Sequence, residues 1–99
     1  MKIFISQPMK DKTDEQIKEE RNRIIEFAKE NYGDDIEIID SFFEGAPHDA
    51  NPLWFLGESF KKLSEADVCI FAKGWKRARG CRLEHKACLF YGIAIKEMT

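Results

Sequence analysis

The chain has 99 residues, enough for one domain, because cores divide into separate domains only beyond roughly 250 residues. Hydrophobic residues make up 43% of the chain and charged residues 34%, a balance that excludes a disordered protein. The net charge of −2 excludes a protein that is basic over its whole surface, although it leaves room for a local basic patch.

The first half of the chain predicts a strand, a long helix and a second strand. Residues 2–6 (KIFIS) are rich in β-forming residues and predict the first strand. Thr13 and Gln16 have the spacing of a capping box, which predicts the start of a helix that runs to about Tyr32. Residues 36–39 then predict the second strand.

The second half predicts a helix, a buried strand, a further helix and a last strand. Asn51, followed by a proline, predicts the start of a helix that runs to about Ser64. Residues 67–72 (DVCIFA) are continuously apolar, as a buried parallel strand is, and residues 80–91 and 93–96 predict the last helix and strand. The alternation of strands and helices predicts one α/β domain with a doubly wound parallel sheet of about four strands and three helices.

Four consecutive apolar residues, Leu53 to Leu56, open the helix that follows Asn51. Successive helical residues turn by about 100°, so these four side chains point in four directions around the axis. A helix that is apolar all round needs cover on both sides. We therefore expect a second copy of the chain as a partner, in a homodimer or a larger homo-oligomer.

The cysteines and the apolar runs indicate the compartment. Cys69, Cys81 and Cys88 are odd in number and lack C-x-x-C spacing, which predicts reduced thiols. Cys81 lies at a predicted helix start, a position that lowers the pKa of a thiol. No apolar run reaches the roughly 18 residues of a membrane span, and residues 1–3 lead into structure rather than into a signal peptide. We expect a cytoplasmic protein with no membrane partner.

Three loops follow strands whose carboxyl ends share one edge of a parallel sheet, and ligands bind at that edge in doubly wound folds. These loops are residues 6–9, 40–49 and 73–79. We therefore expect a ligand pocket formed by their polar and aromatic side chains: Ser6, Gln7, Asp40, Glu44, His48 and Trp75.

Residues 73–82 carry five cations: Lys73, Lys76, Arg77, Arg79 and Arg82. Cations at a helix N-terminus, combined with free backbone N–H groups, favour an anion such as a phosphate. The alternative is a solvated basic loop. Nucleic-acid binding is not favoured, because Trp75 is the one aromatic residue among these cations. Gly74 and Gly80 do not complete a known phosphate-binding motif.

Glu84 falls in the first or second turn of the last predicted helix, just inside the same edge. A carboxylate there is either a catalytic group or a glutamate that stabilises the helix dipole or a salt bridge, and spacing does not separate these roles. His85 is expected to face solvent or to pack. One histidine does not make up a zinc-ligand set, so we predict neither a metal nor a cofactor.

Several segments of the chain resemble one protein family. They are KIFISQPM (residues 2–9), LSEADV (63–68), FAKGW (71–75) and RGCRLEH (79–85). These segments resemble a small family of bacterial and phage proteins. That family is similar, more distantly, to the superfamily of nucleoside 2-deoxyribosyltransferases and deoxynucleoside-monophosphate N-glycosidases. The resemblance extends from residue 1 to about residue 95.

The resemblance implies a flavodoxin-like fold, a homo-oligomer, and an enzyme that splits or exchanges the bond between deoxyribose C1′ and a nucleobase. The nucleophile of the superfamily is a glutamate preceded by a glycine four residues earlier, which Glu84 and Gly80 match. A carboxylate at this position stabilises the positive charge that develops on the sugar and traps C1′ covalently. The implied substrate-binding residues are Phe4, Ser6, Gln7, Pro8, Asp40, Gly74, Trp75, Arg79, Gly80 and Arg82.

The chain departs from the superfamily at two positions. Ser59, with Glu58 beside it, stands where the enzymes carry an aspartate that positions the sugar, and Arg82 replaces a glycine. We predict catalytic roles for Glu84, Ser59 and Glu58, and Arg82 is a candidate for holding a phosphate. The donor that protonates the leaving base is one of four residues: Asp40, Glu44, His48 or Glu58.

Two functions follow. One is a deoxyribosyltransferase or nucleotide N-glycosidase that acts on a nucleoside or nucleoside monophosphate through Glu84. The alternative is a non-catalytic nucleotide-binding module or sensor that uses the same pocket.

Overall fold

The computed structural model describes residues 1–39 and 48–99. Within this part of the chain, one sheet holds four parallel strands in the order β2-β1-β3-β4. The helices between them are α1, α2 and α3. This arrangement confirms the predicted flavodoxin-like α/β fold. The bounds are β1 Lys2–Ser6, α1 Asp14–Tyr32, β2 Glu37–Ile38, α2 Pro52–Leu63, β3 Val68–Phe71, α3 Arg79–Tyr91 and β4 Ala94–Glu97.

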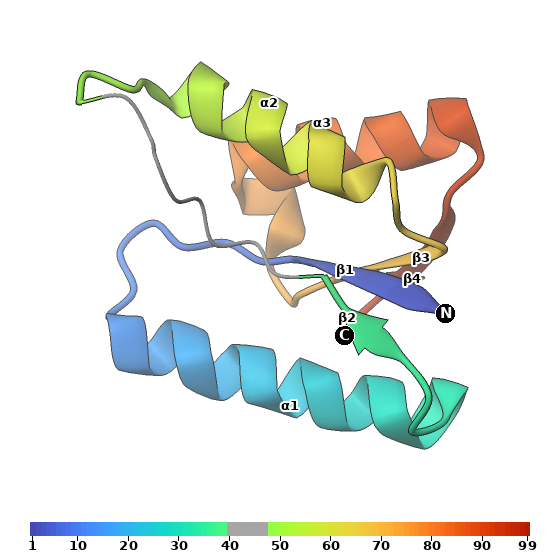
Figure 1. Cartoon of the computed structure of the whole chain (residues 1–99). Helices are drawn as coiled ribbons and strands as arrows, with labels where there is room; N and C mark the ends of the chain where they lie inside the picture. The colour runs from blue at the N-terminus through green and yellow to red at the C-terminus, as the bar shows by residue number, and fades with distance from the viewer. Residues whose placement is uncertain (40–47) are drawn as a thin grey trace.

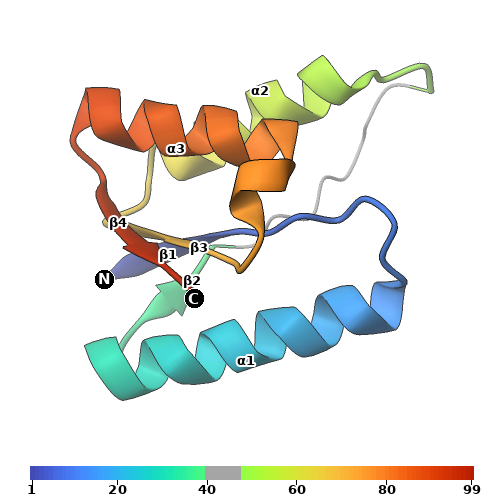
Figure 2. The same ribbon diagram turned by 180° about the vertical axis from the view of Figure 1, so that it is seen from behind.

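The helices cover both faces of the sheet. Helix α1 lies on one face, and α2 and α3 lie together on the other (Figure 1). Seen from behind, α3 stands in front of α2, above the strands β3 and β4 (Figure 2). The chain leaves β1 and β3 at the same edge, where the loop to α1 and the short 3-10 turn η1 (Trp75–Arg77) lie.

The predicted capping residues set the ends of the helices. Thr13 Oγ1 accepts a hydrogen bond from Gln16 N at 3.1 Å, and Gln16 Oε1 accepts one from Thr13 N at 2.9 Å, which completes the capping box. Asn51 Oδ1 accepts a hydrogen bond from Trp54 N at 3.0 Å at the start of α2. Helix α3 ends at Tyr91, and its C-cap residue Gly92 has a φ of 73°, in the left-handed region that favours glycine.

The strands differ from the prediction at their ends. Strands β2 and β3 are each two residues shorter than predicted, and β4 lies one residue further along. The flanking residues still bond across the sheet, since Asp67 N donates to Lys2 O at 2.8 Å and Ala72 N donates to Ser6 O at 2.9 Å. The loop predicted over residues 73–79 contains η1. These differences concern element ends, where assignments commonly vary by a residue or two.

The alternation of side chains along β1 divides the core in two. Ile3 and Ile5 pack against α1, whereas Phe4 packs with Phe71 on the side of α2 and α3. Burial of each such side chain contributes roughly 1.5–3 kcal/mol. Because successive residues of a strand point to opposite faces, Ser6 points to the same side as Phe4. The end of β1 therefore presents a hydroxyl group toward α3.

Two further features of the described residues concern the cysteines and the helices. All three cysteines are free thiols and are buried. Within residues 1–39 and 48–99, none of the helices has the length and the apolar composition that a membrane crossing requires.

Candidate functional site

A buried hydrogen bond joins the first strand to the last helix at the carboxyl edge of the sheet. Ser6 Oγ, at the end of β1, donates to Glu84 Oε1 in α3 at 2.9 Å. The exposed fraction of Ser6 is 2% and that of Glu84 is 7%. Glu84 shares the inner side of α3 with Cys81 and Cys88, at spacings of three and four residues. The predicted reactive carboxylate thus points inward, at the predicted edge.

Burial changes the acidity of Glu84. Removal from water disfavours the charged form and raises the pKa of Glu84 from 4.5 to about 7, although the hydrogen bond from Ser6 acts in the opposite direction. Both the carboxylate and the carboxylic acid are therefore populated at neutral pH. Such a group is suited to nucleophilic attack in one form and to proton transfer in the other.

The second oxygen of Glu84 makes no hydrogen bond with the described residues. Among the described residues, Glu84 accepts a hydrogen bond through Oε1 and none through Oε2. Every fully enclosed side-chain oxygen or nitrogen of these residues has a hydrogen-bond partner, so Oε2 is not fully enclosed. The hydrogen bond therefore fixes one oxygen of the carboxyl group and leaves the other without a hydrogen-bond partner among the described residues.

Cys81 lies beside this pair as a neutral thiol. Burial raises the pKa of Cys81 to about 11, an effect larger than the lowering by the nearby Ser6 hydroxyl. The expectation that the helix start lowers this pKa is therefore wrong, because burial of the thiol raises it. A thiol of this pKa is protonated at neutral pH and is a poor nucleophile.

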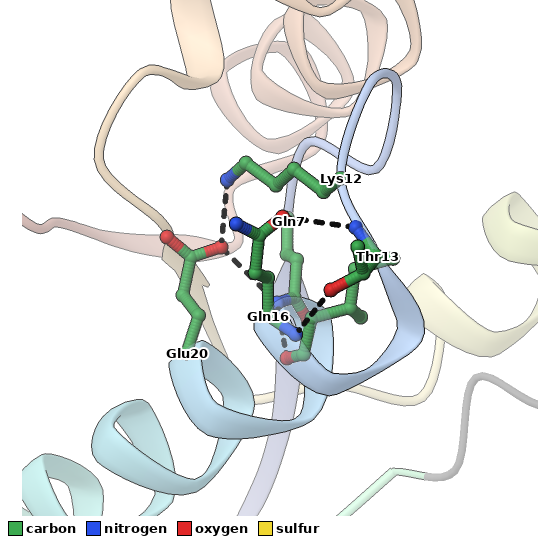
Figure 3. Close-up of polar contacts among 6 residues, drawn as sticks. Gln7, Lys12, Thr13, Gln16 and Glu20 are labelled. Carbon is green, nitrogen blue, oxygen red and sulfur yellow. Dashed lines mark hydrogen bonds and ion pairs between the residues drawn. The ribbon is translucent and has the colours of Figure 1, made fainter.

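A polar network attaches the loop after β1 to helix α1. Gln7 Nε2 donates to Ile17 O at 2.8 Å and to Glu20 Oε1 at 3.1 Å, and Lys12 Nζ lies 3.2 Å from the same Glu20 oxygen (Figure 3). The charge of Lys12 lowers the pKa of Cys81 and the charge of Glu20 raises it. Gln7, a predicted site residue, serves here as an anchor for the loop.

Lys12 and Glu20 belong to this edge of the sheet, although the sequence did not single them out. One signal was present in the pattern of α1. Glu20 falls between Ile17 and Ile24, in the stripe of residues that faces the sheet and includes the buried Ile24. A carboxylate in an apolar stripe needs a partner, and Lys12 and Gln7 supply it.

The remaining residues predicted near the first loop and in the basic run occupy varied positions. Phe4 is 2% exposed and belongs to the core, and Pro8 is half-buried.

Gly74 has a left-handed φ of 84° before η1. Gly80 lies near Leu56 of α2, whose Cδ1 atom is 4.0 Å from the point where a Cβ would sit. Other predicted residues of this segment, Arg79 and Arg82, are exposed.

Trp75 and the basic run form their own surface next to α3. The Trp75 indole stacks on the His85 imidazole with ring centroids 4.0 Å apart and planes 8° apart. Two surface hollows share Trp75 and Lys76, and neither is lined by Glu84. Arg82 lines one of them, so the structure brings Arg82 together with Trp75 rather than with Glu84.

Of the four candidates for a proton donor, the structure describes Glu58 and His48. Glu58, on α2, forms an ion pair with Lys61, with 3.0 Å between Nζ and Oε1, and Ser59 beside it is half-buried. His48 is exposed. Asp40 and Glu44 lie outside the described residues.

The described residues contain no arrangement for a metal ion. Among residues 1–39 and 48–99, no group of three or more His, Cys, Asp or Glu side chains is placed to hold one. Cys88 follows His85 by three residues, but no group of three possible ligands includes them among the described residues. Cys88 is 1% exposed and lies in the core with Cys69, whose pKa it raises, whereas His85 contacts Trp75 and Glu97.

Comparisons with protein-family models, with curated proteins and with solved structures found no match. The resemblance to the nucleoside 2-deoxyribosyltransferase superfamily therefore stays a prediction that rests on the motifs of this chain. The geometry around Glu84 is the independent observation on which a function is argued.

Proposed function

We propose that the chain is a nucleoside deoxyribosyltransferase or nucleotide N-glycosidase that acts on a nucleoside or nucleoside monophosphate, with Glu84 as the nucleophile. The observation that carries this proposal is the buried Ser6–Glu84 hydrogen bond at the carboxyl edge of a parallel sheet. It unites a motif residue from each end of the chain at the edge where such folds bind ligands.

The reaction needs one carboxylate oxygen and one proton donor. Oε2 of Glu84 attacks C1′ as the bond between C1′ and the base nitrogen breaks, and the electron pair of that bond leaves with the base. A donor protonates the departing base. Water or a second base then attacks C1′ and releases the Glu84 carboxylate, giving hydrolysis or transfer.

Ser6 is a positioning residue in this scheme. Its hydroxyl donates to Oε1, which fixes the orientation of the carboxyl group and stabilises the ionised form. Because Glu84 is 7% exposed, a sugar reaches Oε2 only by displacing side chains that cover it. The same burial removes water from the carboxylate and strengthens its interaction with a positively charged sugar.

The proposal is tested by product analysis. Purified protein is incubated with a panel of 2′-deoxynucleosides and their 5′-monophosphates, and free base is separated by reversed-phase chromatography. We expect base release that Glu84→Gln lowers at least about a hundredfold, since this variant keeps the shape and removes the nucleophile. Absence of free base from every substrate, or equal rates for Glu84→Gln and the wild type, would refute the proposal.

The alternative, a non-catalytic nucleotide-binding module at the same edge, has one observation in its favour. The Glu84 carboxyl group already has a hydrogen-bond partner and is buried, as a structural glutamate would be. Calorimetry with the same nucleotides separates the two functions. Saturable binding without release of base supports the module, and absence of binding excludes it.

We also propose that the chain assembles as a homodimer or larger homo-oligomer in the cytoplasm. Apolar side chains remain exposed on the neighbouring helices α2 and α3, notably Leu53 at 72%, Phe90 at 78% and Tyr91 at 83%. A monomeric mass by light scattering at high micromolar concentration would refute the assembly. The free buried thiols agree with a reducing compartment, and recovery in a secreted fraction would refute that location.

A further inference from the structure

A basic hollow lies beside α3, on the side of the helix next to Trp75. Its volume is about 420 Å³, which falls in the range of small-molecule sites. Among the described residues no acidic side chain lines it, and its lining combines three cations, an imidazole and two apolar side chains. These residues, named together the basic hollow, are Trp75, Lys76, Arg82, His85, Lys86 and Leu89.

Two residues that line the basic hollow, Trp75 and His85, belong to a packed stack of rings. Trp75 lies parallel to His85, and Phe71 of β3 contacts both rings, with centroid distances of 5.4 Å and 4.9 Å. His85 Nε2 is also within hydrogen-bond distance of Glu97 Oε2 on β4, at 3.0 Å. These contacts tie the stack to two strands, so the wall that a ligand would meet is preorganised.

The cations of the basic hollow lack acidic partners. In the part of the chain that the structure describes, neither Arg82 nor Lys86 lies within ion-pair distance of a carboxylate. Lys76 lies over the Trp75 ring, with Nζ 5.8 Å from its centroid. Like charges held close together repel one another, and an anion between them removes that repulsion.

The basic hollow and Glu84 occupy different sides of α3. Glu84 lies on the buried side with Cys81 and Cys88. Arg82 and Lys86 are four residues apart and exposed, so they form a neighbouring pair on the outer side of the helix. A phosphate held by this pair is therefore not attached to a sugar that reacts at Glu84.

We propose that the basic hollow is a second binding site, which takes a small organic phosphate and is independent of the function proposed for Glu84. The guanidinium of Arg82 and the ammonium groups of Lys86 and Lys76 bind the phosphate oxygens. Trp75 and Leu89 contact the organic part of the ligand. The basic hollow has a single indole, and His85 covers one face of it. A nucleic-acid strand needs successive stacking surfaces, so this arrangement favours a compact ligand.

The test follows the Trp75 indole N–H signal by heteronuclear NMR while AMP is added, with adenosine, inorganic phosphate and an oligothymidylate as further probes. We expect saturable shifts with AMP that adenosine does not produce. The double variant Arg82→Gln with Lys86→Gln should bind AMP at least about tenfold more weakly than the wild type, because each substitution removes a charge-assisted hydrogen bond. The matched control is Lys18→Gln with Arg23→Gln, which removes two exposed cations of α1.

Each outcome of this titration decides the proposal. If the control pair weakens AMP binding equally, the attraction is a general electrostatic one and the proposal is overturned. A titration that does not saturate at millimolar AMP also overturns the proposal. Tighter binding of the oligothymidylate than of AMP, with a steep salt dependence, indicates a nucleic-acid surface instead. Loss of AMP binding in Glu84→Gln places the ligand at Glu84 and overturns the second site. If the double variant does not fold, the single variant Arg82→Gln replaces it. Its affinity for AMP should fall, and the affinity of Arg82→Lys should recover.

Discussion

Substitution of Glu84 by glutamine tests the buried carboxyl group through the pH dependence of stability. In the folded chain the pKa of Glu84 is about 7, whereas its ordinary value is 4.5. Below about pH 4.5 the group is protonated in both the folded and the unfolded chain. As the pH rises from there through 7, the unfolded chain releases this proton first, so the free energy of unfolding falls. Glutamine is neutral throughout and lacks this loss.

The size of the effect follows from the two pKa values. Between about pH 5 and about pH 8, the wild type should lose about 2–3 kcal/mol of stability relative to Glu84→Gln, on an order-of-magnitude basis. Urea unfolding followed by circular dichroism at both pH values measures this difference. Glu58→Gln is the matched control, since Glu58 forms a surface ion pair worth up to about 0.5 kcal/mol. A pH-independent difference between the wild type and Glu84→Gln would refute the reasoning.

Three further predictions follow from the described contacts. Ser6→Ala removes a donor to the carboxylate and should raise the pKa of Glu84 above about 7 in an NMR titration, and an unchanged or lower value would contradict this role. Cys81 should react slowly with iodoacetamide in the native state at neutral pH and quickly in urea, whereas fast native labelling would show an ionised thiol. Gly92→Ala should cost about 1 kcal/mol because of its left-handed φ, while Gly57→Ala, in open space within α2, should stabilise by up to about 1 kcal/mol; the same sign for both would be inconsistent with the described backbone.

The sequence was sufficient for the fold and for the location of the Ser6–Glu84 pair. Local signals such as the capping box at Thr13 and the N-cap at Asn51 depend on neighbouring residues, so they are legible without tertiary information. The order of strands and helices, together with right-handed crossovers, places the ends of β1 and β3 at one edge. The alternation along β1 then brings Ser6 to the side of α3.

Other parts of the candidate site depend on packing that no local pattern encodes. The stack of Trp75 on His85 joins a turn without periodicity to a helix, and the sequence placed Trp75 in a pocket shared with Glu84. The acidity of Cys81 was misjudged because the extent of burial, and not the helix start, decides it. Lys12 and Glu20 are two charges among many along α1, and their contact forms only once the loop after β1 folds back.

The most direct test of the proposed chemistry is the mass of the protein during turnover. The wild type is mixed with a deoxynucleoside monophosphate or its nucleoside, quenched in acid, and analysed intact and after proteolysis. The proposed mechanism predicts an added deoxyribosyl group, with or without its phosphate, on the peptide that contains Glu84, and no such addition in Glu84→Gln. Attachment to another residue, or release of base by Glu84→Gln at the wild-type rate, would contradict the nucleophilic role of Glu84.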